Sequence, residues 1–321
     1  MFLDAWGTGT LGFKKISGVS PMSSSLVAAA AVTSLLSHGF DTSIETHRAR
    51  ISTATDLSYG REETLSLLDE LSTFESGRFL LKNQGLDGEW ISYLILDAPL
   101  REDLCPLEHW MVHRAPSALA TRARFWIFQE VMTARLQDNM RIASVPCGLM
   151  EDLLHLPTQG LANIALVGID LDENALKMAA ENAQSKGFHN ASFIQKDAWD
   201  LGEENAYDLL TSSGLNIYVT DPVRHEALFE SFFKALKPGA VLVSSFWTPP
   251  PALNPASPWV DVDPQDALKQ KVVFKDIIGA KWQNFDMPGT ITAQLTRIGY
   301  KDIQILPDPN WIMPTVVATK P

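Results

Sequence analysis

The stretch from Ile142 to Asp170 constrains the fold of this chain more than any other. It begins with a short apolar strand, Ile142 to Val145, which runs into a tight turn at Pro146–Gly148. After a loop, a β-branched run ends in an acidic residue, Asp170. In a doubly wound parallel sheet, a carboxylate about 20 residues past the glycine turn accepts hydrogen bonds from ribose hydroxyls. The stretch therefore predicts a nucleoside cofactor site.

The sequence from Arg141 onward alternates between strand and helix patterns, which predicts a parallel sheet with helices on both faces. The helix after Asp170 is the best defined, because Asp172 can cap its start and Gly187 can end it. Pro238 and Gly239 predict a type II turn before the fifth strand. The expected strands are Ile142 to Val145, Ile164 to Asp170, Ala191 to Gln195, Tyr207 to Ser212, Ala240 to Phe246, Asp302 to Leu306 and Thr315 to Thr319.

Residues 40–140 carry helical periodicity and almost no strand signal. We expect helices at Asp69 to Phe79 and at Ala118 to Gln137, and Arg122 lies on the apolar stripe of the second helix with Phe125. An arginine on a buried face needs a partner, and a cofactor carboxylate would be one. The alternative is a surface arginine at the edge of the core. We predict a flexible leader at 1–25 and an all-helical N-terminal cap at 26–140, before a sheet domain at 141–321.

Composition limits the kinds of partner and the cellular compartment that we expect for this protein. A chain of 321 residues with 45% hydrophobic residues can bury a large core. The formal net charge of −12 disfavours a nucleic-acid partner, because phosphate binding requires a basic surface. Two cysteines far apart in sequence favour a reducing, cytoplasmic location. The apolar run Leu26–Leu36 is either an export signal or an alanine-rich helix, and it is shorter than the ~20 apolar residues of a membrane span.

Three fragments, taken together, resemble one enzyme family. They are Leu166-Val-Gly-Ile-Asp-Leu-Asp172, Tyr207-Asp-Leu-Leu-Thr-Ser-Ser-Gly-Leu215 and Leu236-Lys-Pro-Gly-Ala-Val-Leu-Val243. Their order and spacing resemble the class I S-adenosylmethionine-dependent methyltransferases, over roughly residues 141–320. The resemblance implies a Rossmann-like, doubly wound α/β sheet of seven strands, the last antiparallel. It also implies S-adenosyl-L-methionine as cofactor.

The resemblance assigns roles at the nucleoside end of the cofactor. Asp170 would accept from both ribose hydroxyls, and Leu171 would pack on the adenine. Asp197 would bind the adenine amino group, with the N–H of Ala198 and the ring of Trp199 beside it. The alternatives are an ordinary strand end at Asp170, and at Asp197 a turn followed by a core tryptophan.

The glycine turn departs from the family pattern of an acidic residue followed by Gly-x-Gly-x-Gly. Ser144, Pro146, Gly148 and Met150 occupy these positions, and only the Cys147–Gly148 pair remains. We expect Pro146 to remove a donor and Met150 to add bulk beside the methionine part of the cofactor. Ser144 can hydrogen-bond the cofactor ammonium, and a charge at Glu151 or Asp152 would compensate; the alternative for Asp152 is an early-helix carboxylate. The candidate cofactor contacts are Ser144, Pro146, Cys147, Gly148, Asp170, Leu171, Asp197, Ala198, Trp199, Ser213 and Arg122.

The implied chemistry is an in-line displacement, in which a nucleophile attacks a methyl group already activated by a sulfonium. Positioning supplies most of the catalysis, and a base is needed only if the nucleophile must lose a proton. The loop after the fourth strand faces the methyl group in this fold. Asn216, Tyr218 and His225 are therefore the candidate catalytic residues, with Asp221 as a further substrate contact. The alternative for His225 is a solvated histidine at the start of a helix.

Residues 247–291 form an insertion that is rich in aromatic side chains, among them Trp247, Trp259, Trp282 and Phe285. These residues either line a substrate pocket or form a small core of their own. The sequence has no phosphate loop, HExxH motif or Gly-x-Ser-x-Gly elbow. His109 and His113 stand four residues apart without a third ligand nearby, so we predict no metal site.

These observations predict S-adenosylmethionine-dependent methyl transfer to a small-molecule acceptor. One alternative is a catalytically silent cofactor-binding or scaffold protein with the same fold, because the glycine turn is degenerate. A second alternative is a nicotinamide oxidoreductase, but the sequence lacks the Gly-x-Gly-x-x-Gly motif expected of that class.

Overall fold

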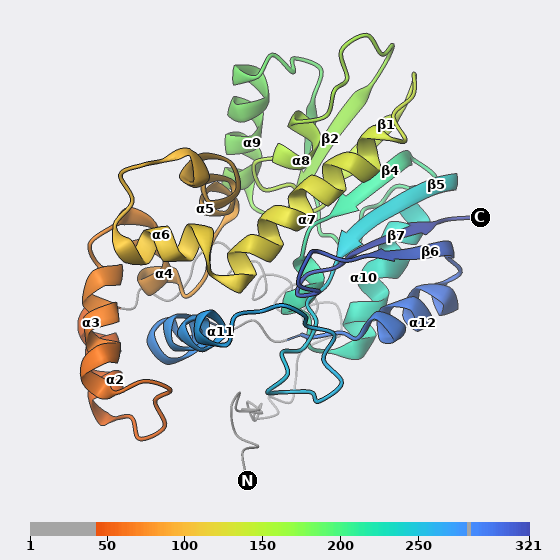
Figure 1. Cartoon of the computed structure of the whole chain (residues 1–321). Coiled ribbons are helices and arrows are strands. Elements are labelled where there is room, and N and C mark those ends of the chain that lie inside the picture. The colour runs from red at the N-terminus through yellow and green to blue at the C-terminus, as the bar shows by residue number, and fades with distance from the viewer. Residues whose placement is uncertain (1–42, 281–283) are drawn as a thin grey trace, which may run out of the picture.

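The computed structural model describes residues 43–280 and 284–321 (Figure 1). The predicted leader and the apolar run Leu26–Leu36 lie outside the described residues, and so does Trp282. None of the helices in the described part of the chain has the length and apolar character needed to cross a membrane.

A seven-stranded sheet in the order β3-β2-β1-β4-β5-β7-β6 forms the centre of the molecule (Figure 1). The first five strands pair in parallel, and β7 runs antiparallel to both β5 and β6. This confirms the predicted Rossmann-like sheet with its antiparallel last strand. The strands are β1 (Arg141–Ser144), β2 (Ala165–Asp170), β3 (Ser192–Gln195), β4 (Tyr207–Ser212), β5 (Leu236–Ser245), β6 (Lys301–Leu306) and β7 (Thr315–Thr319).

The fifth strand begins four residues earlier than the sequence pattern indicates. Tyr207 pairs with Leu236 and Leu209 with Val241, so residues 237–240 bulge out of the ladder between these pairs. Gly239 has a φ of 82° in this bulge. The Pro-Gly pair therefore forms an irregularity within β5. Gly239 adopts the left-handed conformation there, and β5 still pairs with β4 on both sides of it.

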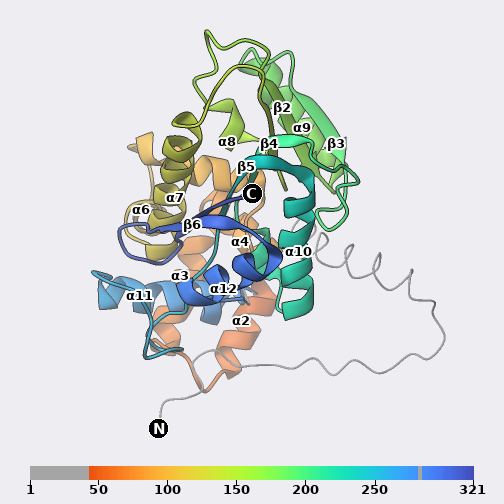
Figure 2. The same ribbon diagram turned by 90° about the vertical axis from the view of Figure 1, so that its right-hand side faces the viewer.

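Helices cover both faces of the sheet. On one face lie α7 (Pro116–Thr133), α8 (Glu151–Leu154) and α9 (Glu173–Ser185), and on the other lie α10 (Pro222–Ala235) and α12 (Pro288–Ile298) (Figure 2). Alternate strand residues feed the two cores: Ile142 packs on the α7 side and Ala143 on the α10 side. As predicted, the Asp172 side chain caps α9, accepting from the N–H of Asn174 at 2.9 Å.

The described residues before α7 form helices joined by loops, and none of them lies in a strand. They form α2 (Ile44–Thr53), α3 (Arg61–Leu71), α4 (Glu75–Asn83), α5 (Gly88–Ser92), η1 (Tyr93–Asp97), η2 (Ala98–Leu100) and α6 (Pro106–His113). Two helices of the insertion, α11 (Pro264–Lys271) and η4 (Val272–Ile278), join them (Figure 1). Val272 and Ile277 of η4 are fully buried in the same core as Leu68 and Leu80. We call residues 43–115 together with 264–278 the helical cap.

Two predicted helices differ from the observed ones. The predicted helix Asp69 to Phe79 is wrong, because α3 ends at Leu71 and α4 begins only at Glu75. Between them, the hydroxyls of Ser72 and Thr73 donate to the carbonyl oxygens of the preceding turn and compete with helix continuation. The predicted helix Ala118 to Gln137 is α7, which begins earlier, at Pro116, and ends at Thr133.

Candidate functional site

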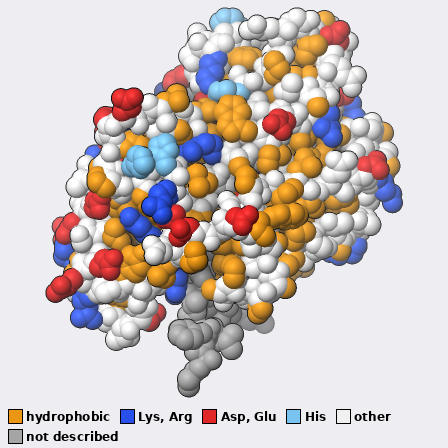
Figure 3. Space-filling view, in the orientation of Figure 1, with side chains coloured by type: hydrophobic (Ala, Val, Ile, Leu, Met, Phe, Trp, Pro, Cys, Tyr) orange, Lys and Arg blue, Asp and Glu red, His pale blue; other side chains and the backbone are white. Residues whose placement is uncertain are grey.

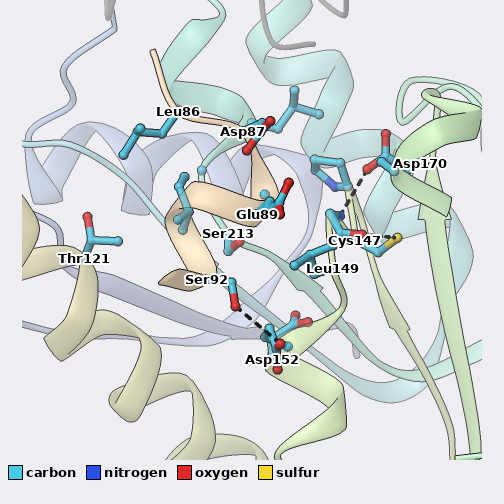
Figure 4. Close-up of a pocket in the computed structure, with 18 of the residues that line it drawn as sticks. Leu86, Asp87, Glu89, Ser92, Thr121, Cys147, Leu149, Asp152, Asp170 and Ser213 are labelled. Atoms are coloured by element: carbon cyan, nitrogen blue, oxygen red, sulfur yellow. Dashed lines mark hydrogen bonds between the residues drawn. The ribbon is translucent and has the colours of Figure 1, made fainter. Parts of the chain in front are cut away.

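A cavity of about 480 Å³ lies between the carboxyl ends of β1, β2 and β4 and the helical cap (Figure 4). This volume is typical of a small-molecule site. On the sheet side it is lined by the turn 145–149, the end of β2, the segment 196–199 and the loop 213–218. On the other side it is lined by α5, η1, α6 and α7, together with Trp247, Phe274 and Met313.

Asp170 is held at the tip of β2 by the glycine turn. Its carboxylate accepts from the N–H of Gly148 and from the N–H of Asp172, each at 3.1 Å. Burial raises the pKa of Asp170, and these backbone hydrogen bonds oppose the rise. A carboxylate offers about four lone-pair sites, so this group retains the capacity to accept from a ligand in the cavity.

The glycine turn is covered by α5. A Cβ on Gly88 would lie 3.1 Å from the Cα of Gly148, so the two backbones approach more closely than side chains would allow. Gly148 itself has a φ of 49°. The Cys147 thiol is buried beside this turn, and burial raises its pKa. A protonated buried thiol packs as a small apolar group.

Met150 does not add bulk to the cavity, contrary to the sequence expectation. Its side chain is fully buried in the core on the α7 face of the sheet. The left-handed backbone of Met150, with a φ of 58°, accompanies this placement at the start of α8. Pro146, in contrast, does line the cavity.

Ser144 does not line the cavity either; its place there is taken by Asp152. The Ser144 hydroxyl donates to Oδ2 of Asp152 at 2.8 Å, and the Thr211 hydroxyl donates to the same oxygen at 2.5 Å. The Asp152 carboxylate is buried and lines the cavity. Burial raises its pKa, whereas the two hydroxyls and the charge of Arg124 lower it.

Arg124, and not Arg122, reaches the cavity. Arg122 donates to the carbonyl oxygens of Leu94 and Val112 and so ties α7 to the helical cap. The guanidinium of Arg124 is buried, lines the cavity, and donates to the carbonyl oxygen of Ser213 at 2.9 Å. Its Nε has no hydrogen-bond partner among the described residues. Burial lowers the pKa of Arg124 to about 10, and the nearby Asp152 opposes the fall.

Glu151 is already engaged by neighbouring side chains. Its carboxylate accepts from Asn182 at 3.0 Å, lies 3.1 Å from Nδ1 of His155, and pairs with Lys186. Burial raises the pKa of Glu151, but these partners outweigh it and lower the pKa to about 2. The cluster connects α8 to α9, which favours a structural role for Glu151.

Leu171, Asp197, Ala198 and Trp199 all line the cavity beyond Asp170. The Asp197 side chain accepts from the N–H of Trp199 at 3.0 Å, which makes a tight turn after β3. The Trp199 indole donates to the carbonyl oxygen of Arg224 at 2.8 Å, and the Arg224 guanidinium lies 4.7 Å from the ring centroid. The ring is therefore fixed in orientation at the edge of the cavity.

Of the three candidate catalytic residues, only Tyr218 lines the cavity. Asn216 is buried below the loop after β4, and its amide has no hydrogen-bond partner among the described residues. His225 is 4% exposed and shares a hydrogen bond with Gln294 through Nδ1; its Nε2 lies 3.4 Å from the Asp286 carboxylate. Burial lowers the pKa of His225. His225 is therefore a buried link between α10, α12 and the insertion, and neither it nor Asn216 touches the cavity.

The aromatic residues of the insertion both line the cavity and form a small core of their own. Trp247 lines the cavity, whereas Trp259 and Phe285 pack behind it with Ile312 in a small separate core. Phe274 of η4 also lines the cavity. Phe274, Met111 and Thr121 are not identifiable as site residues from the sequence, because their approach to the cavity depends on how the helical cap packs on the sheet.

His109 and His113 stack with ring centroids 4.5 Å apart. Within the described residues, no three histidine, cysteine or acidic side chains are grouped closely enough to hold a metal ion.

Comparison with known proteins identifies the family of the domain that contains this site. Residues 136–285 match a family model described as a methyltransferase domain. These residues belong to the class I S-adenosylmethionine-dependent methyltransferases. S-adenosylmethionine is the cofactor of this methyltransferase. No curated protein matches the sequence.

Solved structures with the same architecture include three that cover most of this methyltransferase. A Bordetella parapertussis protein, described as a possible exported protein, is 38% identical with a TM-score of 0.83, over 95% of this chain and 100% of that one. The CurJ carbon methyltransferase is 14% identical with a TM-score of 0.51, over 82% and 71% of the two chains. The S-adenosylmethionine-dependent methyltransferase SibL in its apo form is 15% identical with a TM-score of 0.51, over 91% and 69%. The last two similarities concern the fold alone.

Proposed function

We propose that this methyltransferase transfers the methyl group of S-adenosylmethionine to a small molecule held between the sheet and the helical cap. The observation that carries this proposal is the continuity of one cavity. The same space touches Asp170 and Asp197 on the sheet and Thr121, Trp247 and Phe274 on the opposite side. Donor and acceptor therefore fit side by side in a single cavity.

The nucleoside part of the cofactor belongs beside Asp170 in this proposal. The free acceptor capacity of the Asp170 carboxylate suits two ribose hydroxyls. Leu171 and Ala198 supply apolar surface for the adenine, and Asp197 supplies a carboxylate near its amino group. The fixed ring of Trp199 closes the outer edge.

The amino-acid part of the cofactor belongs between Arg124 and Asp152. A buried guanidinium with an unsatisfied Nε suits a carboxylate, and a buried carboxylate suits an ammonium group. The zwitterionic end of the cofactor supplies both charges. This pair therefore replaces the acidic residue and the glycines that are missing from the turn.

The cofactor, when bound, supplies a methyl group that the sulfonium has already activated. The protein contributes binding, orientation and exclusion of water. Arg124 and Asp152 hold one end, Asp170 the other, and the loop 213–218 lies against the middle. The acceptor is positioned by contact with the helical cap and with Tyr218, which lines the cavity.

A small molecule fits this site better than a macromolecule. The cavity lies between the sheet and the helical cap, so the reacting part of an acceptor must enter it. Acidic and basic side chains are interspersed on the face of the protein in Figure 3, and the net charge of −12 opposes binding of nucleic acid. Because its cysteines are free thiols, we place the protein in the cytoplasm.

A catalytically silent protein with this fold is the second candidate, because Gly148 is the only glycine left in the turn. Calorimetry with S-adenosylmethionine and S-adenosylhomocysteine, followed by a radiolabelled methyl screen of small molecules, distinguishes the two. We expect both ligands to bind and label to appear in a small-molecule product. Binding without any transfer would favour the silent protein, and absence of binding would contradict both candidates.

A further inference from the structure

We infer that the acceptor is an uncharged aromatic amine or nitrogen heterocycle, and that it is methylated on nitrogen. The cavity joins a charged cofactor side, which α5 covers, to an uncharged side that we call the cap side. The cap side is formed by η1, α6, the start of α7, the loop 213–218 and the insertion, and it holds no general base. This inference rests on the proposed function and names the substrate class of the same site.

The charged residues that line the cavity lie on the cofactor side. Asp170, Asp172, Lys196 and Asp197 surround the nucleoside end, and Arg124, Glu151 and Asp152 surround the amino-acid end. Asp87 and Glu89 belong to the α5 segment that covers the glycine turn. A Cβ on Gly88, which stands between them in sequence, would lie 3.1 Å from the Cα of Gly148. In Figure 4 Asp87 and Glu89 lie between Thr121 on the left and Asp170 and Cys147 on the right.

The cap side of the cavity is lined by uncharged groups. Its walls are Leu94, Ile95, Met111, Ala118, Thr121, Ile217, Tyr218, Trp247, Phe274 and Met313. Burial of an unpaired charge against such walls is strongly unfavourable. The part of the acceptor that enters this side is therefore uncharged.

Six aromatic side chains line the cavity, which favours a flat aromatic acceptor. They are Phe125, Phe128, Trp199, Tyr218, Trp247 and Phe274. Offset or edge-to-face contacts with such rings add to the hydrophobic gain of burying an aromatic compound. The same ring faces attract a positive charge, such as the sulfonium of the cofactor.

The absence of a base on the cap side limits the chemical class of nucleophile that the acceptor can present. Among the described residues that line it, none carries a carboxylate, imidazole, amine or thiol; its polar groups are the hydroxyls of Ser117, Thr121 and Tyr218 and the indole N–H of Trp247. The candidate base His225 lies outside the cavity. Phenols, alcohols and thiols need a base to become good nucleophiles at neutral pH. A neutral aromatic amine or heterocyclic nitrogen already presents a lone pair.

Methyl transfer to nitrogen needs no acid or base from the protein. The nitrogen lone pair forms the new C–N bond while the C–S bond breaks and its electron pair returns to sulfur. The positive charge moves from the sulfonium to the nitrogen, so the net charge of the cavity does not change. A heterocyclic nitrogen leaves as an N-methyl cation, and a methylated amine loses its proton to water.

The excess of acidic groups around the cavity fits a positively charged product. Seven acidic residues line it, against the two basic residues Arg124 and Lys196. A cleft of one sign concentrates ligands of the opposite charge and repels those of the same charge. This field attracts the sulfonium cofactor and a cationic product, and it disfavours carboxylate and phosphate acceptors.

The test uses four flat probes of similar size: isoquinoline, 1-aminonaphthalene, 1-naphthol and 1-naphthoate. Binding of each is measured by calorimetry at pH 8 with S-adenosylhomocysteine present, and methyl transfer is measured with labelled S-adenosylmethionine. We expect the three neutral probes to bind at least about tenfold more tightly than naphthoate. We expect label only in the N-methyl products.

A pair of variants on α7 locates the acceptor. Thr121→Asp places a carboxylate on the cap side, and Thr133→Asp places one on the exposed end of the same helix. We expect Thr121→Asp to weaken isoquinoline binding at least about tenfold without changing binding of S-adenosylhomocysteine. Thr133→Asp should change neither.

Several outcomes would overturn the inference while leaving the proposed function intact. They are transfer to the naphthol oxygen, naphthoate binding as tight as isoquinoline binding, or failure of the nitrogen probes to bind or to accept methyl while S-adenosylhomocysteine binds. Unchanged isoquinoline binding in Thr121→Asp would do the same. Failure of S-adenosylhomocysteine to bind would instead remove the proposed function itself.

Discussion

Burial determines what each charged side chain around the cavity can do. Asp170, Asp152 and Arg124 are all withdrawn from water, yet each keeps part of its hydrogen-bonding capacity unused by the protein. An isolated buried charge is costly, so a ligand that supplies the missing partner gains more than it would at the surface. Glu151 is the contrast, because its neighbours already saturate it.

We predict that Asp170→Asn weakens binding of S-adenosylmethionine by about 1 to 3 kcal/mol, since the ribose loses a charged acceptor. Asp221→Asn is the matched control. Asp221 also accepts from two backbone N–H groups, but it is exposed and caps α10, where asparagine serves equally well. Calorimetry on both variants measures the difference, and equal affinity of Asp170→Asn and wild type would place the ribose elsewhere.

A second pair separates the two neighbouring arginines of α7. We predict that Arg124→Gln weakens binding of S-adenosylhomocysteine by about 1 to 3 kcal/mol, because the ligand carboxylate loses its buried cation. Binding of methylthioadenosine, which lacks the amino-acid end, should not change. Arg122→Gln, which removes hydrogen bonds to Leu94 and Val112, should lower stability without this selectivity. Equal losses for both ligands in Arg124→Gln would contradict the assignment.

Glu151 makes stability depend on pH. Its folded-state pKa of about 2 lies below the unfolded value of 4.5, so its contribution is present above pH 4.5 and is lost as the pH falls toward 2. We predict that Glu151→Gln lowers the free energy of unfolding at pH 7 by about 2 to 3 kcal/mol. Urea unfolding of both proteins between pH 7 and 3 should show this difference shrinking below pH 4.5. A difference that is constant over that range would show that the carboxylate charge is not responsible.

At the scale of secondary-structure elements, the contact between α5 and the glycine turn closes the site. A Cβ on Gly88 would lie 3.1 Å from the Cα of Gly148, closer than ordinary van der Waals contact, so a methyl group there must push the two segments apart. We predict that Gly88→Ala displaces α5 and speeds dissociation of S-adenosylhomocysteine several-fold, measured by stopped-flow displacement.

Gly85→Ala is the control for this contact, because a Cβ there meets nothing within 4 Å. It should leave the dissociation rate unchanged. Equal rates in both variants would mean that α5 does not retain the ligand.

At the scale of the whole molecule, the helical cap is built from two distant parts of the sequence. Ile277 of the insertion is fully buried among α2, α3 and α4 residues. We predict that Ile277→Ala costs about 2 to 5 kcal/mol of stability. Hydrogen exchange should show the greatest loss of protection in α2 to α4, with β1 and β4 less affected.

The control in the same insertion is Leu268→Ala, since Leu268 is 41% exposed. Its effect should stay below about 1 kcal/mol. Uniform loss of protection over cap and sheet in Ile277→Ala would indicate that the two unfold as one unit.

The sequence by itself determined the sheet. Alternating apolar strands, the capped helix after Asp170 and the three family fragments are local patterns, and local patterns set which segments become strands, how they follow one another and which carboxylate ends β2. The strand boundaries agree within a few residues for this reason, and the cofactor followed from the same fragments.

Only the tertiary structure decided which side chains meet at the cavity. Arg122 and Arg124 are two residues apart on one helix, and their roles depend on the rotation of α7 against the sheet. His225 and Asn216 follow β4 as expected but turn into the core, and Met150 points below the turn instead of into the cavity. Phe274 reaches the site because the insertion packs into the helical cap. Each of these placements depends on contacts between residues far apart in sequence, which no local pattern records.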